Sequence, residues 1–319
     1  MTSFNKSYLD ELASKHNFIR DNLEKVLRLA EILSYINKDD LLSPSLALKG
    51  GTAINLTIFR MPRLSVDIDL DYNINCSKEE MLTARKRINN LIMRYMMSEG
   101  YQLKPTSKNP LSLDSWVFGY TNAGGNLDSI KIEINYSNRC HMLPAVQKTT
   151  DVGFLHEITI SILDPKELFA SKINALISRG AMRDLYDVNN MLSARMFLER
   201  KEYDMLRRMF VLYHCIGASS KAEEVSLEFR QLPKIETITF SQVKAQLIPV
   251  LRKDEHFDYQ EAKNRVIEFL TEFLQFDESE HEFVCHFNKR EYMPELLFED
   301  TDIVERIRTH PMALWKCRN

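Results

Sequence analysis

The sequence predicts an α+β protein, with a mixed α/β amino-terminal half and a helical carboxy-terminal half. Short runs that alternate polar and apolar residues, the period of a β-strand, fall before residue 163. Beyond residue 164 almost every segment has helical character, interrupted mainly at prolines. The chain has 319 residues, 44% of them hydrophobic, which is enough for two globular domains. We therefore expect a sheet domain over 1–163 and an α-helical domain over 164–319.

The first part of the chain is predicted to form a helix, a strand and a short helix. Apolar residues recur at steps of three and four over 7–37, which predicts one amphipathic helix that ends before Ser43-Pro44. Residues 46–48 form a short apolar run that Gly50-Gly51 terminates. A short helix is expected from residue 52 to about residue 59, stopped by the following proline.

The middle of the chain supplies most of the predicted sheet. Residues 65–72 alternate in the strand period, and a long helix over 78–98 follows, closed by a glycine. The runs 116–120 and 129–136 flank a turn-rich segment and predict a hairpin. Weaker apolar runs, at 101–104 and 158–163, complete the set of expected strands.

The helical half begins with a clear start signal. Asp164 is placed as a helix N-cap, Pro165 as the first helical residue and Glu167 as the third, the pattern of a capping box. This helix is expected to end at Gly180, and a second helix is expected over about 182–195.

The strand over 65–72 carries the pattern that points most directly to chemistry. Residues two apart on a strand face the same side, so the carboxylates of Asp67 and Asp69 converge on one small volume. Hard oxygen ligands of this kind suit Mg²⁺, including the paired ions that serve nucleotidyl transfer. The alternative is a solvated strand face, although Asp is a poor strand former and like charges on one face repel.

Residues upstream of this acidic pair suggest a phosphate site. Gly50-Gly51 permit close backbone approach to a ligand, and Thr52 opens a helix whose amides can face a phosphate. By the two-residue period Arg63 and Ser65 share the face of the acidic pair. A plain tight turn with a Thr cap, and an ion pair of Arg63 with the acidic strand, are the structural alternatives.

A third carboxylate lies on a second alternating strand. Glu133 shares a face with Lys131 and Asn135, and is a candidate third metal ligand or acceptor of the proton from an attacking hydroxyl. The alternative is a surface Glu on a half-exposed strand.

Charged residues on the two helices after residue 164 form a last candidate group. Lys172 and Arg179 lie on one helical stripe among leucines, and steps of three and four place Arg183, Asp184 and Asp187 on one face. A snorkelling lysine and an Arg183–Asp187 helix pair are the alternatives, and spacing alone favours them.

Bulk properties bound the environment and the partners. The formal net charge is −3, so a nucleic-acid partner would have to meet a local basic patch, for which the segments around 85–87, 200–208 and 306–318 are candidates. No apolar run approaches the roughly 20 residues needed to span a bilayer. Five scattered cysteines without a Cys-x-x-Cys motif fit reduced thiols, so we expect a cytoplasmic protein.

Taken together, these patches resemble the AbiEii/AbiGii toxin family, which includes the MenT toxins and belongs to the polymerase-β-like nucleotidyltransferases. The family's first motif is matched by Lys49-Gly50-Gly51-Thr52-Ala53, and its Arg-x-Ser-x-Asp-x-Asp motif is matched by Arg63, Ser65, Asp67 and Asp69. Its helical motif is matched by Lys172, Ala175-Leu176 and Arg179. Its Arg-Asp-x-x-Asp motif is matched by Arg183, Asp184 and Asp187, with Met191 in place of the usual Leu.

The resemblance implies a polymerase-β-like core and a working set of Ser65, Asp67, Lys172, and Asp184 or Asp187, with Asp69 completing the metal site. It also implies a nucleoside triphosphate as donor, the 3′ end of tRNA as an acceptor in some relatives, and a cognate antitoxin. The expected function is Mg²⁺-dependent transfer of a nucleoside monophosphate to RNA by a growth-inhibiting toxin. Two alternatives stay open: a protein hydroxyl or small molecule as acceptor, and a non-catalytic binding module.

Overall fold

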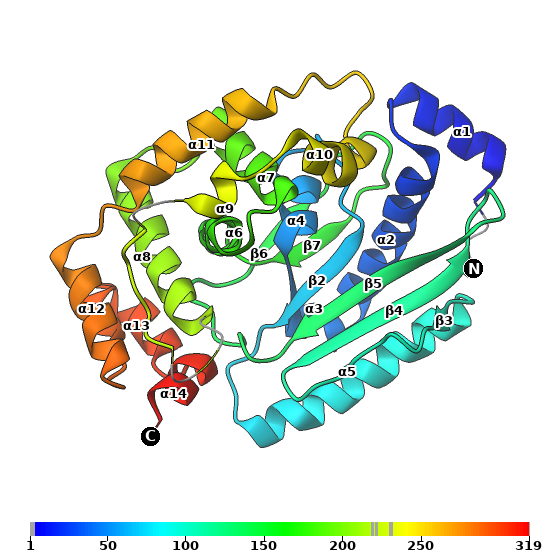
Figure 1. Ribbon diagram of the computed structural model, residues 1–319. Coiled ribbons are helices and arrows are strands. Elements are labelled where there is room, and N and C mark those ends of the chain that lie inside the picture. Colours follow the sequence, from blue (N-terminus) through cyan, green and yellow to red (C-terminus); the bar gives the residue numbers. More distant parts are fainter. Residues whose placement is uncertain (1–3, 218–219, 221–222, 230–231, 319) are drawn as a thin grey trace. The chain divides into compact units, whose positions relative to one another are not determined.

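The structure is a computed structural model that describes residues 4–217, 220, 223–229 and 232–318 (Figure 1). The chain forms two compact units. The sheet unit comprises 4–139, 145–163 and 248–255, and the helical unit comprises the described residues of 140–144, 164–247 and 256–318. Two short segments therefore belong to the unit opposite to their neighbours in sequence.

The sheet unit is built on a seven-stranded mixed sheet in the order β3-β4-β5-β2-β1-β7-β6. Its central strands are β1 (Leu46–Lys49), β2 (Asp67–Tyr72) and β5 (Leu127–Asn135). Strand β2 pairs antiparallel with β1 and parallel with β5, and β1 pairs parallel with β7. The remaining strands are β3 (Gln102–Leu103), β4 (Leu113–Thr121), β6 (Val146–Thr149) and β7 (Thr159–Ile162).

The two faces of this sheet differ sharply in chemistry. One face carries large apolar side chains such as Ile68, Ile132 and Trp116, all 0% exposed. Helices α2 (Arg20–Lys38) and α5 (Lys78–Ser98) cover it, and the two helices contact each other through stacked Tyr35 and Tyr95 rings. The opposite face carries the alternating polar residues of β2 and β5, so the pleat itself separates the core from the candidate site.

Most predicted elements of the sheet unit are confirmed, and several differ in extent. The helix expected over 7–37 is two helices, α1 (Lys6–Lys15) and α2, because Asn17 between them adopts a left-handed backbone with φ of 58°. Strand β2 begins at Asp67, two residues later than expected. The short helix begins earlier, as α4 (Gly50–Ala53), and continues as a π-helical turn, η1 (Ile54–Ile58).

The start signal of helix α6 (Pro165–Arg179) is confirmed except for its glutamate. Asp164 accepts a hydrogen bond from the Lys166 amide, and Gly180 ends the helix with a φ of 61°. Glu167, expected to complete a capping box, is instead fully buried and accepts hydrogen bonds from the Leu143 amide and the Tyr213 hydroxyl. It thus holds segment 140–144 to the helical unit.

The helical unit packs its longer helices in pairs, with α8 (Arg200–Gly217) against α6 and α11 (Tyr259–Phe273) against α7 (Met182–Ser193) (Figure 1). The predicted helical character of this half is confirmed. Its other elements are α9 (Pro233–Glu236), α10 (Phe240–Gln242), η2 (Val243–Leu247), α12 (Glu278–Asn288), η4 (Pro294–Leu296), α13 (Thr301–Ile307) and α14 (Pro311–Cys317). The turn η3 (Ile248–Val250) and helix α3 (Leu42–Ser45) belong to the sheet unit.

Candidate active site

The acidic face of β2 lies beside a second acidic strand. In the parallel pairing of β2 with β5, Asp67 is the neighbour of Lys131 and Asp69 is the neighbour of Glu133. Asp67, Asp69 and Glu133 therefore share the polar face of the sheet, and all three are half-buried. The Lys131 ammonium lies 2.9 Å from the Glu133 carboxylate, so the charge of Glu133 is already compensated in part.

The donor chemistry of this face fits a magnesium ion, because Asp67 and Asp69 offer hard oxygen ligands two residues apart on one strand. Among the residues that the structure describes, no three His, Cys, Asp or Glu side chains are gathered closely enough to hold a metal ion. A bound ion would thus rely on Asp67 and Asp69 first, and the place of Glu133 among its ligands stays a prediction.

The Gly50-Gly51 turn lies directly against the acidic pair. Gly50 has a φ of 69°, and a Cβ atom added there would lie 2.8 Å from Asp69 Oδ2. A Cβ atom on Gly51 would lie 2.8 Å from Arg63 Nη2 and 3.3 Å from Ser65 Oγ. Only glycine allows the backbone to approach these three side chains so closely, whereas the close approach to a bound ligand that the sequence predicted stays a prediction.

Thr52 ties this turn to the start of β2. Its hydroxyl donates to the Asp67 carbonyl at 2.5 Å and lies 2.8 Å from Ser65 Oγ, and its side chain is buried. Asn55, one turn later, donates to the Gly51 carbonyl at 2.9 Å. The turn is thereby held from both ends, and the predicted contact of Thr52 with a phosphate would involve its backbone amide.

Arg63 and Ser65 both precede strand β2, although Ser65 was expected to begin the strand and the two-residue period had placed both on its acidic face. Arg63 forms an isolated antiparallel bridge with Leu251, and the Leu64 amide donates to the Val250 carbonyl at 2.8 Å. The Arg63 side chain is 2% exposed and lies beneath Gly51. The side chains of Arg63 and Ser65 thus lie against Gly51, next to the glycine that contacts Asp69; their binding of nucleotide stays a prediction.

A pair of glycine substitutions tests the close approach at Gly50. Both Gly50→Ala and Gly125→Ala place a side chain on a left-handed backbone, which costs about 1–2 kcal/mol of stability at each position. At Gly125 no atom of the described residues lies within 4 Å of the added Cβ atom, whereas at Gly50 the methyl group must displace the Asp69 carboxylate. We expect similar losses in thermal unfolding but a loss of nucleotidyl transfer in Gly50→Ala alone; equal activity of the two variants would contradict this contact.

The helical unit holds a second charged cluster, around Lys172. Its ammonium lies 3.0 Å from Asp184 Oδ1 and 3.1 Å from Asp187 Oδ2, and the three side chains are 7%, 1% and 0% exposed. Arg179 adds two hydrogen bonds to Asp184, from Nε at 2.6 Å and from Nη2 at 3.0 Å. The structure thus gathers four of the predicted side chains in one cluster: Lys172, Arg179, Asp184 and Asp187. The alternatives considered from spacing were a lysine that extends to solvent and a separate Arg183–Asp187 pair.

The electrostatics of this cluster keep Asp184 ionised. Burial by itself raises the pKa of Asp184, but Lys172 and Arg179 outweigh burial and hold that pKa below its ordinary value of 3.8. The structure gives these residues contacts that spacing did not predict: Arg183 Nε donates to the Gln246 carbonyl at 2.8 Å, and Asp187 pairs with Lys172.

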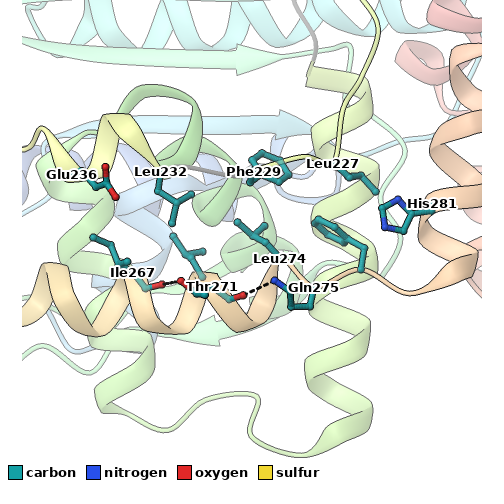
Figure 2. A pocket seen from close by; sticks show the side chains of 11 residues that line it. Leu227, Phe229, Leu232, Glu236, Ile267, Thr271, Leu274, Gln275 and His281 are labelled. Atoms are coloured by element: carbon teal, nitrogen blue, oxygen red, sulfur yellow. Dashed lines mark hydrogen bonds between the residues drawn. The ribbon is translucent and has the colours of Figure 1, made fainter.

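A cavity of about 430 Å³ in the helical unit lies apart from these residues. Leu232, Leu274, Phe229, Phe276 and His281 are among the side chains that line it, and Figure 2 shows it open beside helix α11. None of the predicted site residues lines it. This cavity is therefore distinct from the candidate site.

Comparisons with known proteins identify the family and the fold. The family model described as "Nucleotidyl transferase AbiEii toxin, Type IV TA system" matches residues 31–279, most of the chain. The fold is similar to that of MenT4, the nucleotidyltransferase toxin Rv2826c from Mycobacterium tuberculosis H37Rv, with a TM-score of 0.58 and 16% sequence identity over 99% of this chain and 100% of that chain. A search of the curated proteins found no match.

Fold and family model define the class as a nucleotidyltransferase toxin, and the predicted α+β fold is confirmed. The chain belongs to the AbiEii toxin family of type IV toxin–antitoxin systems. The predicted enzymatic class, nucleotidyl transfer, is confirmed with it, which sets aside the non-catalytic alternative.

Proposed function

We propose that the protein transfers a nucleoside monophosphate from a nucleoside triphosphate to the 3′ end of a tRNA in a magnesium-dependent reaction. It acts in the cytoplasm as the growth-inhibiting toxin that a cognate antitoxin restrains. The observation that carries the proposal is the acidic pair: Asp67 and Asp69 share one face of β2, with Gly50 packed against Asp69 and Ser65 beside Gly51. The described residues contain no helix long and apolar enough to cross a membrane.

The residues of the sheet unit would bind the triphosphate and the metal. Asp67 and Asp69, with Glu133 as a third ligand, would hold magnesium, which activates the attacking hydroxyl and neutralises the leaving pyrophosphate when bound. The backbone amides of Gly50, Gly51 and Thr52 would donate hydrogen bonds to the phosphate oxygens, and the Ser65 hydroxyl would orient the phosphate. Arg63, beneath Gly51, would supply positive charge to the turn.

The residues of the helical unit would serve the same reaction by countering phosphate charge. Lys172 and Arg179 are the cations, and Asp184 and Asp187 hold the Lys172 ammonium in place at 3.0 and 3.1 Å. A lysine anchored in this way keeps one orientation and loses little entropy when a phosphate oxygen approaches it.

One observation favours a second candidate acceptor, a protein hydroxyl or a small molecule. Several basic residues in the segments that the sequence suggested for RNA binding are buried and make internal contacts. Arg85 is paired with Asp114, Arg207 with Glu280, and the Lys316 ammonium donates to the Ser220 carbonyl. All three are buried, so they add nothing to an external basic groove.

The acceptor can be identified by supplying each labelled nucleoside triphosphate with Mg²⁺ and either purified tRNA, tRNA-depleted RNA or RNA-free protein extract. Label in tRNA supports the proposal, and label in the protein fraction supports the second candidate. Transfer that is equal in wild type and Asp67→Ala, or absent with every acceptor, contradicts both. Chelation of Mg²⁺ is expected to abolish the label in either case.

A further inference from the structure

The polar face of the sheet, which carries Asp67 and Asp69 on β2, continues across β5 and β4 to the edge strand β3 (Figure 1). Residues that lie directly opposite each other on paired strands point to the same side of a sheet. The register of these strands therefore identifies which side chains beyond β5 share the face of the acidic pair.

Lys104 ends the cross-strand row that begins at Asp67. The opposed residues of this row are Asp67 on β2, Lys131 on β5 and Val117 on β4. The Lys104 amide donates to the Val117 carbonyl at 2.8 Å, which continues the pairing of β3 with β4. A Cβ atom added to Gly119 would lie 2.8 Å from Lys104 Cε. The lysine side chain therefore lies over β4, on the polar face.

Lys108 ends the neighbouring row, which begins at Asp69. On β5 Glu133 is opposite Asp69, and on β4 Ser115 is opposite Glu133. Lys108 and Ser115 form an isolated antiparallel bridge, with a backbone hydrogen bond of 2.8 Å in each direction. Lys108 therefore faces the same side of the sheet as Asp69.

The two lysines make the outer part of the polar face cationic. Lys131 is already paired with Glu133 at 2.9 Å. Among the residues that the structure describes, by contrast, Lys104 and Lys108 have no ion-pair partner. Lys104 is half-buried and Lys108 is exposed. Each row thus begins at a carboxylate of the acidic pair and ends at an ammonium group that can receive an anion.

The spacing of the strands suits a nucleic-acid strand laid across this face. Neighbouring strands lie about 4.8 Å apart, so β4, two strands away from β2, is about 10 Å from it. A stacked nucleic-acid strand advances about 3.4 Å per nucleotide, so this distance corresponds to about three nucleotides. An RNA strand whose terminal hydroxyl reaches Asp67 and Asp69 would therefore bring its preceding phosphates over β4, beside the two ammonium groups.

We propose that Lys104 and Lys108 bind phosphates of the RNA strand that carries the acceptor hydroxyl, about three nucleotides before its end. The inference rests on the proposed function, because it takes Asp67 and Asp69 as the reaction centre and RNA as the acceptor. Neither lysine belongs to the basic segments that the sequence suggested, since the sheet register and not a local cluster of charges identifies them. The rival is that the two lysines bind the triphosphate of the donor nucleotide.

The kinetic test uses the double variant Lys104→Met/Lys108→Met. Methionine keeps most of the apolar stem of a lysine, and the backbone hydrogen bonds of both residues do not depend on the side chain. The KM for tRNA is expected to rise roughly tenfold, while kcat and the KM for the nucleoside triphosphate stay close to wild type, because the lost charges act on the acceptor. An unchanged KM for tRNA, or a rise in the KM for the triphosphate in its place, would overturn the proposal.

A second double variant, Lys86→Met/Arg87→Met, controls for the loss of positive charge. Both residues are exposed on α5, which covers the opposite face of the sheet. This variant removes the same number of charges from the same unit and is expected to keep the wild-type KM for tRNA. A tenfold rise in this variant as well would assign the effect to net charge, and not to position on the polar face, and would overturn the proposal.

RNA binding without transfer supplies a readout that is independent of activity. The probe is labelled tRNA whose terminal nucleotide lacks its hydroxyl groups, and its affinity is measured over a range of salt concentrations. Each bound phosphate of a single strand contributes about 0.7 to the slope of log K against log salt, so the slope of Lys104→Met/Lys108→Met is expected to be about 1.4 shallower than that of wild type. An unchanged slope would overturn the proposal. Failure of the proposed function shows separately, as absence of transfer to RNA by the wild type.

Discussion

Asp67→Asn is expected to lower kcat/KM for nucleotidyl transfer by roughly a thousandfold, because metal-bound charge stabilisation worth several kcal/mol is lost. Asn keeps the size of Asp and lies on a strand whose neighbours Ile68 and Leu70 are buried on the other face, so the fold is retained. Steady-state kinetics with the labelled nucleotide that the wild type prefers measure the effect, and a thermal scan verifies folding.

Asp128→Asn is the control for this substitution. Asp128 belongs to the neighbouring strand β5 and pairs with Lys25, away from the acidic face. It is expected to retain wild-type kinetics. If Asp67→Asn kept more than a tenth of the wild-type activity at saturating Mg²⁺, the assignment of the acidic pair as the metal site would be wrong.

Lys172→Met is expected to destabilise the protein by about 3–5 kcal/mol, the usual cost of removing one partner from a buried ion pair. Two buried carboxylates, Asp184 and Asp187, lose the ammonium that lies between them, and the Arg179 side chain, which pairs with Asp184, is 63% exposed. Denaturant unfolding measures the change. Lys166→Met on the same helix breaks a partly exposed pair with Glu202 and is expected to cost less than about 1 kcal/mol.

The pH dependence of this difference has a defined sign. The pKa of Asp184 is lowered in the folded protein, so its ion pairing stabilises the fold above the unfolded value of 3.8 and is lost as pH falls through the lower folded pKa. The gap in unfolding free energy between wild type and Lys172→Met should therefore be full at pH 6 and narrow below about pH 3.8. A gap that stays constant down to pH 2.5 would contradict the pairing.

Local signals predicted the elements well where the side-chain period is unbroken. The alternation of β2 and β5 and the Asp164-Pro165 start of α6 are examples, because burial of one face imposes the period on the sequence. The break at Asn17 and the edge strand β6 were missed. A single left-handed residue interrupts no apolar pattern, and a strand with one half-buried and three exposed residues shows none.

The composition of the candidate site was predicted largely through resemblance, whereas the contacts within it were not. Spacing could place Asp67 beside Asp69, but it favoured an Arg183–Asp187 pair over the Lys172 contacts that the structure shows. Likewise the position of Lys104 on the polar face depends on the register of β3 against β4, which no local pattern specifies. Sequence patterns of periodicity and spacing do not predict the contacts between elements that are distant in sequence.

Because segment 248–255 belongs to the sheet unit, this unit can be completed only late in the synthesis of the chain. Val250 and Leu251 supply the backbone partners of Leu64 and Arg63, immediately before Ser65 and Asp67. The segment that leads into strand β2 therefore lacks these backbone partners until almost four-fifths of the polypeptide has been synthesised. A chain that ends before residue 248 would contain every predicted site residue and would still lack these two backbone partners.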